Sequence, residues 1–212
     1  MGEINLYQYP ISPFSEKVRR VLTYKQLKWH PIDCHYEDKT NLLAVTKGAW
    51  TRVPVLEWDG EVVCNSADII KWLDRKVPAN RVIPDDSRLL IELIDNWADN
   101  TFFMPILFLT IPDLLDAAGD AKLKLNREKL IGMTTAQMRE SHVPMKEQLA
   151  SHLRMIDDQL ACKDFILGKS FTMADASVYH PLFFLTLNPA SFATVKDFKN
   201  VSRWYERIRD LA

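Results

Sequence analysis

Residues 53–70 read VPVLEWDGEVVCNSADII and combine two short β-prone runs, a tight turn and the start of a helix. The runs 53–58 and 61–64 flank Asp59-Gly60, a dipeptide that favours a two-residue hairpin because both residues tolerate a positive φ. Ser66 then begins a segment with apolar residues at helical spacing, namely Ile69, Ile70, Trp72 and Leu73. This stretch predicts a ββα unit.

The residues before this unit predict a second one. Residues 4–9 form a β-prone run, residues 13–25 carry apolar side chains at helical spacing, and residues 28–34 favour another strand. A strand, a helix of about a dozen residues and a strand imply a right-handed parallel βαβ crossover. The first 78 residues therefore predict a small mixed sheet with helices packed on it.

The remainder of the chain is predicted to be helical. Leu149, Leu153, Ile156 and Leu160 keep the 4-3-4 spacing of a buried helix face. Residues 171–175 favour a helix start, with Thr172 as N-cap and Asp175 at the third helical position. We predict an α/β domain over residues 1–78, a linker over 79–87 and an all-α domain over 88–212.

The composition indicates a globular protein and excludes several functional classes. Of the 212 residues, 27 are Lys or Arg and 28 are Asp or Glu, which gives a net charge of −1. The chain therefore lacks the excess of basic residues that is typical of proteins that bind nucleic acid or an anionic membrane. Three distant cysteines and no visible signal peptide predict a reducing, cytoplasmic location. The apolar stretch 102–115 is interrupted by Pro105 and Pro112, and we expect no membrane span. Histidine spacing and the lack of a Gly-rich phosphate loop predict neither a metal site nor a phosphate cofactor.

Ser12-Pro13-Phe14-Ser15 marks the end of the first strand and the start of the first helix. A side chain there lies beside free backbone N–H groups and the positive end of the helix dipole, an environment that stabilises an anion such as a thiolate. The alternative role for Ser12 is that of an N-cap, with Pro13 at the first helical position. The two roles are compatible, because one hydroxyl can accept from the backbone and donate to a ligand.

The region from residue 53 to residue 70 resembles the glutathione-binding half of cytosolic glutathione transferases. The resemblance rests on residues 53–56, the hairpin and residues 65–70 taken together. The resemblance extends to the linker near residue 80 and to residues 171–175, which are similar to the capping motif of the family's C-terminal domain. It implies a thioredoxin-like βαβ–ββα domain followed by an all-helical domain. It also implies an enzyme with glutathione as co-substrate, a small hydrophobic electrophile as second substrate, a role in detoxification and a homodimer.

The resemblance assigns roles to individual residues. Ser12 matches the serine of the Tau- and Zeta-like classes, which donates a hydrogen bond to the glutathione sulfur. Val53 is expected to pair its backbone with the cysteinyl part, Pro54 to be a cis-proline, and Ser66 to hold the γ-glutamyl carboxylate. Lys39 and Arg52 are candidates for the glycine carboxylate, or else solvated surface charges. The complete expected glutathione-binding set is Phe14, Lys39, Arg52, Val53, Pro54, Asn65 and Ser66.

Two positions depart from the family pattern. Asn65 stands where the family usually has Glu or Gln, so it is one methylene shorter and predicts a weakened site. Ser12 and Ser15 occupy the two cysteine positions of a glutaredoxin-type CPFC motif, and the Omega-like group has its single cysteine at one of these positions. Because this chain has no thiol there, mixed-disulfide chemistry is excluded at this helix terminus. Ser15 and Tyr9 remain alternative donors to the thiol.

The second-substrate site is expected from a cluster of three aromatic residues and one methionine, namely Trp97, Phe102, Phe103 and Met104. Three consecutive helical residues cannot all face one way, so part of this group lines a cleft, a domain seam or a dimer surface. Two other functions remain open because Asn65 weakens the expected site. One is a non-catalytic ligand carrier or interaction domain with this fold, and the other is a glutathione-dependent isomerase or dehalogenase.

Overall fold

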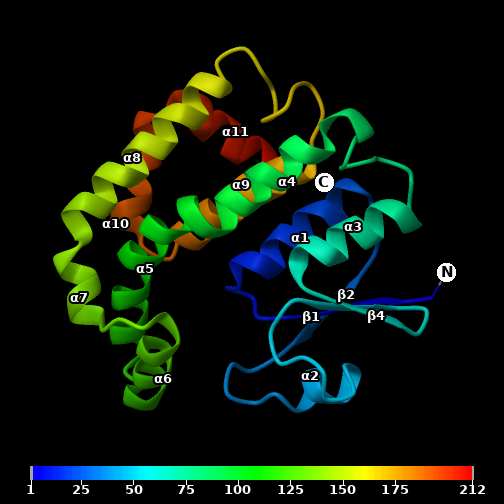
Figure 1. Cartoon of the computed structure of the whole chain (residues 1–212), viewed down its shortest axis with the longest axis horizontal. Coiled ribbons are helices and arrows are strands. Elements are labelled where there is room, and N and C mark those ends of the chain that lie inside the picture. Colours follow the sequence, from blue (N-terminus) through cyan, green and yellow to red (C-terminus); the bar gives the residue numbers. More distant parts are fainter. Residues whose placement is uncertain (1, 212) are drawn as a thin grey trace.

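The computed structural model describes residues 2–211 and begins with a four-stranded mixed sheet (Figure 1). The strands are β1 (Ile4–Gln8), β2 (His30–Asp33), β3 (Val55–Trp58) and β4 (Glu61–Cys64), in the order β2-β1-β3-β4. Strand β1 is parallel to β2 and antiparallel to β3, and β3 is antiparallel to β4. The predicted βαβ and ββα units are confirmed.

Helices cover both faces of the sheet. Figure 1 shows α1 (Pro13–Tyr24) and α3 (Ser66–Lys76) on one face and α2 (Thr40–Val45) on the other. The face under α1 and α3 is continuous with the main core, whereas α2 buries Leu42 in a separate small cluster with Cys34 and Val55. The short helix α2 falls in the segment for which the sequence predicts no defined structure.

The hairpin between β3 and β4 has the predicted turn. Asp59 and Gly60 have φ angles of 53° and 80°, so both lie in the left-handed region that a two-residue hairpin of this twist requires. This turn sets the register in which Val55 faces Cys64. It thereby brings the end of β4 back beside the start of β3.

The second part of the chain is helical, as predicted. Its helices are α4 (Arg88–Trp97), a π-helical turn (Ala98–Phe102), α5 (Phe103–Ala118), α6 (Ala121–Ile131), α7 (Thr135–Glu140), α8 (His142–Gln159), α9 (Met173–Leu185), α10 (Pro189–Phe192) and α11 (Lys199–Arg209). Helix α9 is buried along almost its whole length and packs against α4 and α5 of its own domain and against α1 of the first domain. It is therefore the central element of the domain seam.

The start of α9 has the capping residues that the sequence predicts. The Asp175 carboxylate accepts hydrogen bonds from the Thr172 N–H (2.8 Å), the Thr172 hydroxyl (2.9 Å), the Ile166 N–H (2.7 Å) and the Trp204 Nε1–H (3.0 Å). One buried side chain thus joins the preceding loop, α9 and α11. The predicted apolar stripe on α8, from Leu149 to Leu160, is also buried.

The prediction that prolines break the apolar stretch is wrong, because α5 continues through both of them. Pro105 follows closely on the π-helical turn Ala98–Phe102, where the helical run departs from the α-helical pattern. Pro112 lies inside the helix, and His142 Nε2 is 3.1 Å from the Phe108 carbonyl oxygen that Pro112 leaves without its usual donor. The helical run Asp85–Ala118 is long and apolar enough to cross a membrane, but 56% of its most apolar window is buried inside the protein.

Candidate active site

Four segments meet at one edge of the sheet because of the strand directions. Parallel strands β1 and β2 end there, β4 also ends there, and antiparallel β3 begins there. The segments are those that contain Ser12, Lys39, Val53-Pro54 and Asn65-Ser66. The fold therefore gathers most of the predicted site residues, although they lie up to 54 positions apart in the sequence.

Ser12 is the N-cap of α1 and has an extended backbone. Its Oγ accepts a hydrogen bond from the Ser15 N–H at 3.2 Å, and its own N–H donates to the Tyr9 carbonyl at 3.0 Å. Because the hydroxyl oxygen is used as an acceptor, its proton is free to be donated to another atom. The side chain thus caps α1 and offers one donor at the positive end of the helix.

The two alternative donors are less favourably arranged. Ser15 is fully buried, and its hydroxyl has no hydrogen-bond partner within residues 2–211. The Tyr9 hydroxyl accepts a hydrogen bond from Lys39 Nζ at 2.7 Å, and burial raises the pKa of Tyr9 to about 12. Ser12 is only 8% exposed, and it is the one of the three whose side chain caps the start of α1.

The Val53–Pro54 peptide bond is cis, as the resemblance implies. Pro54 is buried and Val53 is half-buried, so this segment presents backbone at the sheet edge. Arg52 is exposed, and its guanidinium lies 5.5 Å from the Trp50 ring centroid. Arg52 therefore keeps its charged end in solvent, while Lys39 is half-buried against Tyr9.

The start of α3 is organised by Asn65. The residue has a left-handed φ of 72°, which Asn tolerates better than most residues, and its Oδ1 accepts from the Ala67 N–H at 3.0 Å. Its acceptor is used in capping, so its Nδ2–H groups remain as donors. Ser66 is buried at the first turn of α3. These groups suit a carboxylate better than an ammonium group.

The structure separates the four predicted second-substrate residues. Phe103 packs on Phe14 (5.7 Å between ring centroids) and on His180 (6.0 Å), so it lies at the domain seam next to the start of α1. Met104 is about half-exposed beside it. Phe102 is fully buried and stacks on Trp97, so it lines no substrate cavity.

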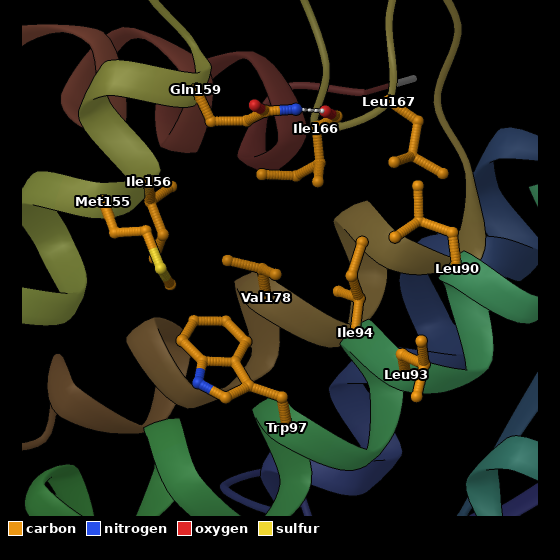
Figure 2. Close-up of a pocket in the computed structure, with 10 residues that line it drawn as sticks. All are labelled: Leu90, Leu93, Ile94, Trp97, Met155, Ile156, Gln159, Ile166, Leu167 and Val178. Atoms are coloured by element: carbon orange, nitrogen blue, oxygen red, sulfur yellow. Dashed lines mark hydrogen bonds between the residues drawn. The ribbon is translucent and has the colours of Figure 1, made fainter.

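Trp97 lies at a different cavity from Phe103. Figure 2 shows it with Leu90 and Ile94 of α4 facing Met155 of α8, and this apolar groove has a volume of about 440 Å³. Leu90, Ile94 and Trp97 lie on one face of α4, as their helical spacing in the sequence predicts. The groove is formed wholly by the helical domain, so it is not part of the sheet-edge site.

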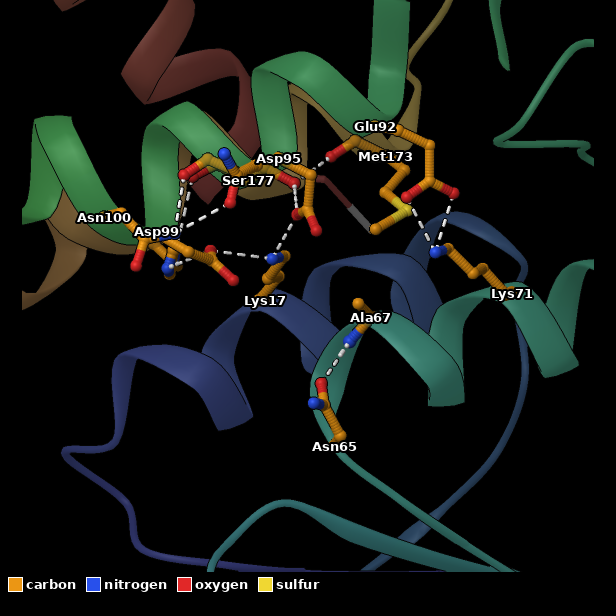
Figure 3. Close-up of polar contacts among 12 residues, drawn as sticks. Lys17, Asn65, Ala67, Lys71, Glu92, Asp95, Asp99, Asn100, Met173 and Ser177 are labelled. Carbon is orange, nitrogen blue, oxygen red and sulfur yellow. Dashed lines mark hydrogen bonds and ion pairs between the residues drawn. The ribbon is translucent and has the colours of Figure 1, made fainter. Parts of the chain in front are cut away.

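A charged cluster that the sequence did not reveal lies at the domain seam (Figure 3). Lys17 of α1 is fully buried and forms salt bridges with Asp95 and Asp99 of the helical domain. His180 Nε2 lies 3.3 Å from Asp99, and burial, followed by the Lys17 charge, lowers the pKa of His180 well below its usual value. Asp95 and Asp99 are four residues apart, a spacing that places two like charges on one helix face and signals a cation from elsewhere.

The three cysteines are all free thiols. Cys34 and Cys64 lie near the sheet-edge site, and burial raises the pKa of both thiols, which disfavours the reactive thiolate. Within residues 2–211, no group of three or more His, Cys, Asp or Glu side chains is arranged to hold a metal ion.

Comparisons with known proteins cover both domains. A family model described as "Glutathione S-transferase, N-terminal domain" matches residues 6–81, and one described as "Glutathione S-transferase, C-terminal domain" matches residues 95–207. A "Probable glutathione S-transferase" of Nicotiana tabacum is 24% identical over 96% of this chain and 82% of that protein.

Two solved fungal structures have similar folds. The glutathione transferase GSTFuA3 of Phanerochaete chrysosporium has a TM-score of 0.84 at 18% identity, covering 99% of this chain and 97% of that one. The transferase CsGST63524 of Ceriporiopsis subvermispora, solved in complex with glutathione, has a TM-score of 0.81 at 17% identity, covering 99% and 97%. At these identities the two structures support the fold.

Proposed function

The chain belongs to the glutathione S-transferase family of enzymes, and on that premise we propose that Ser12 activates the thiol of bound glutathione for attack on a small hydrophobic electrophile. The observation that carries the proposal is the Ser12 hydroxyl, whose oxygen caps α1 while its proton remains available. A free cysteine thiol has a pKa near 8.5. Lowering it by about two units requires about 2.7 kcal/mol, which a hydroxyl donor and a helix N-terminus supply together.

The groups at the sheet edge support one orientation of glutathione. With the sulfur at Ser12, the cysteinyl backbone pairs with Val53 before the cis-Pro54, and the γ-glutamyl carboxylate meets the start of α3 at Ser66. Asn65 contributes Nδ2–H donors to that carboxylate, because its oxygen already caps α3. The glycine end then points to Lys39. Phe14 acts through its backbone, since its ring packs on His180 at the seam.

The electrophile binds beside the sulfur, at the seam between the domains. Phe103 is the predicted residue whose position supports this site, because its ring packs on Phe14 at the start of α1. Met104, the next residue in the chain, is about half-exposed. Attack by the thiolate forms the new carbon–sulfur bond, and the leaving group departs from the electrophile with its electron pair. The free cysteines support a reducing compartment such as the cytoplasm, where such conjugation serves detoxification.

Calorimetric titration with glutathione, followed by thiolate absorbance against pH, tests this function. We expect saturable binding and a bound-thiol pKa about two units below that of free glutathione. Binding of glutathione without a change in its thiol pKa would favour the ligand carrier or a non-conjugating isomerase. The capping role of Asn65 is the reason to consider these two alternatives. An absence of binding at millimolar glutathione would contradict the transferase proposal.

We also propose a homodimer that buries the outer face of α4. Leu93 is 59% exposed there and Leu89 is 74% exposed, so this helix presents leucines to solvent. We expect Leu93→Asp to convert the dimer to a monomer in sedimentation experiments, because it buries an unpaired charge. Leu130→Asp, at a 70% exposed leucine of α6, is the control. A monomeric wild type, or a dimeric Leu93→Asp, would contradict this interface.

A further inference from the structure

Three aromatic rings from three helices meet at the domain seam. The ring centroid of His180 in α9 lies 5.1 Å from that of Phe14 in α1 and 6.0 Å from that of Phe103 in α5, and the two phenylalanine centroids are 5.7 Å apart. His180 is fully buried, whereas Phe14 and Phe103 are half-buried. The two phenylalanines therefore keep part of their surface exposed, and His180 supports both of them from inside the protein.

A backbone carbonyl of its own helix fixes the orientation of the His180 ring. Pro181 lies inside α9, and because proline has no N–H, it leaves the Ser177 carbonyl without the donor that a regular helix supplies. His180 Nδ1 lies 3.1 Å from that carbonyl oxygen. Since a carbonyl oxygen can only accept, Nδ1 carries the proton and donates it to Ser177.

The charged groups beside the ring keep it neutral. They are Lys17 of α1, Asp95 of α4 and Asp99 of the π-helical turn, and His180 Nε2 lies 3.3 Å from Asp99. Burial, followed by the Lys17 charge, lowers the pKa of His180 well below its usual value. With its one proton on Nδ1, the neutral ring has a lone pair at Nε2 and donates nothing to Asp99. His180 therefore holds its neighbours through ring contacts and not through a salt bridge.

We propose that His180 is a positioning residue for the conjugation reaction: its ring holds Phe14 against Phe103 and so keeps the electrophile in line with the thiol. The inference rests on the proposed function. Phe14 lies two residues after Ser12 in the first turn of α1, and Phe103 is the residue whose position supports the electrophile site. One buried ring thus connects the two halves of the reaction, in which a misplacement of about 1 Å costs about 100-fold in rate.

Steady-state kinetics of His180→Leu with glutathione and a small nitroaryl halide test this role. We expect the KM for the halide to rise and kcat/KM to fall about ten-fold, because the two phenylalanines lose the ring between them. The Kd for glutathione and the pKa of its bound thiol should match those of wild type, since Ser12 is untouched. His180→Phe restores a ring without the Nδ1 donor and should return kcat/KM to within about three-fold of wild type.

His142→Leu is the control for a purely structural effect. His142 Nε2 lies 3.1 Å from the Phe108 carbonyl oxygen that Pro112 leaves without its donor, so His142 has the same role in its helix pair as His180 has in α9. Its ring contacts no aromatic ring within residues 2–211. We expect His142→Leu to lower the midpoint of urea unfolding, as His180→Leu does, but to leave the KM for the halide unchanged.

Phe14→Leu provides a second variant that leaves the hydrogen bond between His180 and Ser177 intact. It should raise the KM for the halide as His180→Leu does, and it decides the question alone if His180→Leu does not fold. An unchanged KM in these variants overturns the proposal. Equal rises in KM for His180→Leu and His142→Leu, or no rescue by His180→Phe, also overturn it, because the carbonyl bond would then account for the effect. If wild type forms no conjugate, the proposed function itself fails, whereas a failure of His180 alone leaves wild type active and the variants unchanged.

Discussion

Replacement of Lys17 by methionine is expected to lower the free energy of unfolding by about 3–5 kcal/mol. Lys17 is fully buried at the seam between α1 and the helical domain, and its ammonium group is paired with Asp95 and Asp99. Methionine retains a long apolar side chain, so the change chiefly removes the charge. Two largely buried carboxylates are then left without their cation, and leaving a buried charge unpaired is costly. The midpoint of urea unfolding measures the loss.

Two further measurements connect this loss to the charge cluster. Lys71→Met removes a lysine that pairs with Glu92 where both side chains are partly exposed, and we expect it to cost less than about 1 kcal/mol. The deficit of Lys17→Met should shrink as the pH falls, because burial raises the pKa of Asp99 and protonation of that carboxyl in the folded state removes one of the stranded charges. A Lys17→Met loss no larger than that of Lys71→Met would contradict the importance of the cluster.

Replacement of Ser12 by alanine is expected to reduce kcat/KM for conjugation by about 10- to 100-fold at neutral pH. The variant keeps the helix N-terminus but loses the hydroxyl donor, so the pKa of bound glutathione should rise by about one to two units. Loss of the cap should also lower the free energy of unfolding by about 1 kcal/mol. Initial rates and thiolate absorbance against pH measure the two chemical effects.

The neighbouring serine provides the matched control. Ser15→Ala removes a fully buried hydroxyl that has no partner in the described chain, so neither the thiol pKa nor the rate should change appreciably. Ser12→Thr keeps a hydroxyl and should retain most of the activity. If Ser12→Ala lowers stability but leaves the thiol pKa unchanged, Ser12 is a helix cap alone and the donor must be sought elsewhere.

Much of the fold could be predicted from local patterns. The hairpin at Asp59-Gly60 depends on two residues that adopt a positive φ, and the start of α9 depends on Thr172 and Asp175, three positions apart. Each signal lies within one element or one turn. The effect of Pro112 could not be predicted in this way, because the group that compensates for it comes from His142, on another helix.

The candidate site was predictable only in part, for the same reason. The spacing around Ser12 places a hydroxyl at a helix start, but the backbone pairing of β1, β2, β3 and β4 decides that Lys39, Pro54 and Ser66 meet it at one edge. Periodicity shows that Phe102 and Phe103 point in different directions. It does not show which of them faces α1.

The sequence by itself determined the order of elements, the two-domain architecture and the location of the helix start that bears Ser12, because propensity, turn chemistry and capping act between near neighbours. The tertiary structure alone decided which charges are buried and which groups face one another across the seam. Lys17 meets Asp99 across 82 positions, and Arg127 covers Tyr36 from the other domain. Such pairs depend on how whole elements pack, and the pattern of a single helix or strand carries no information about the partner that will cover it.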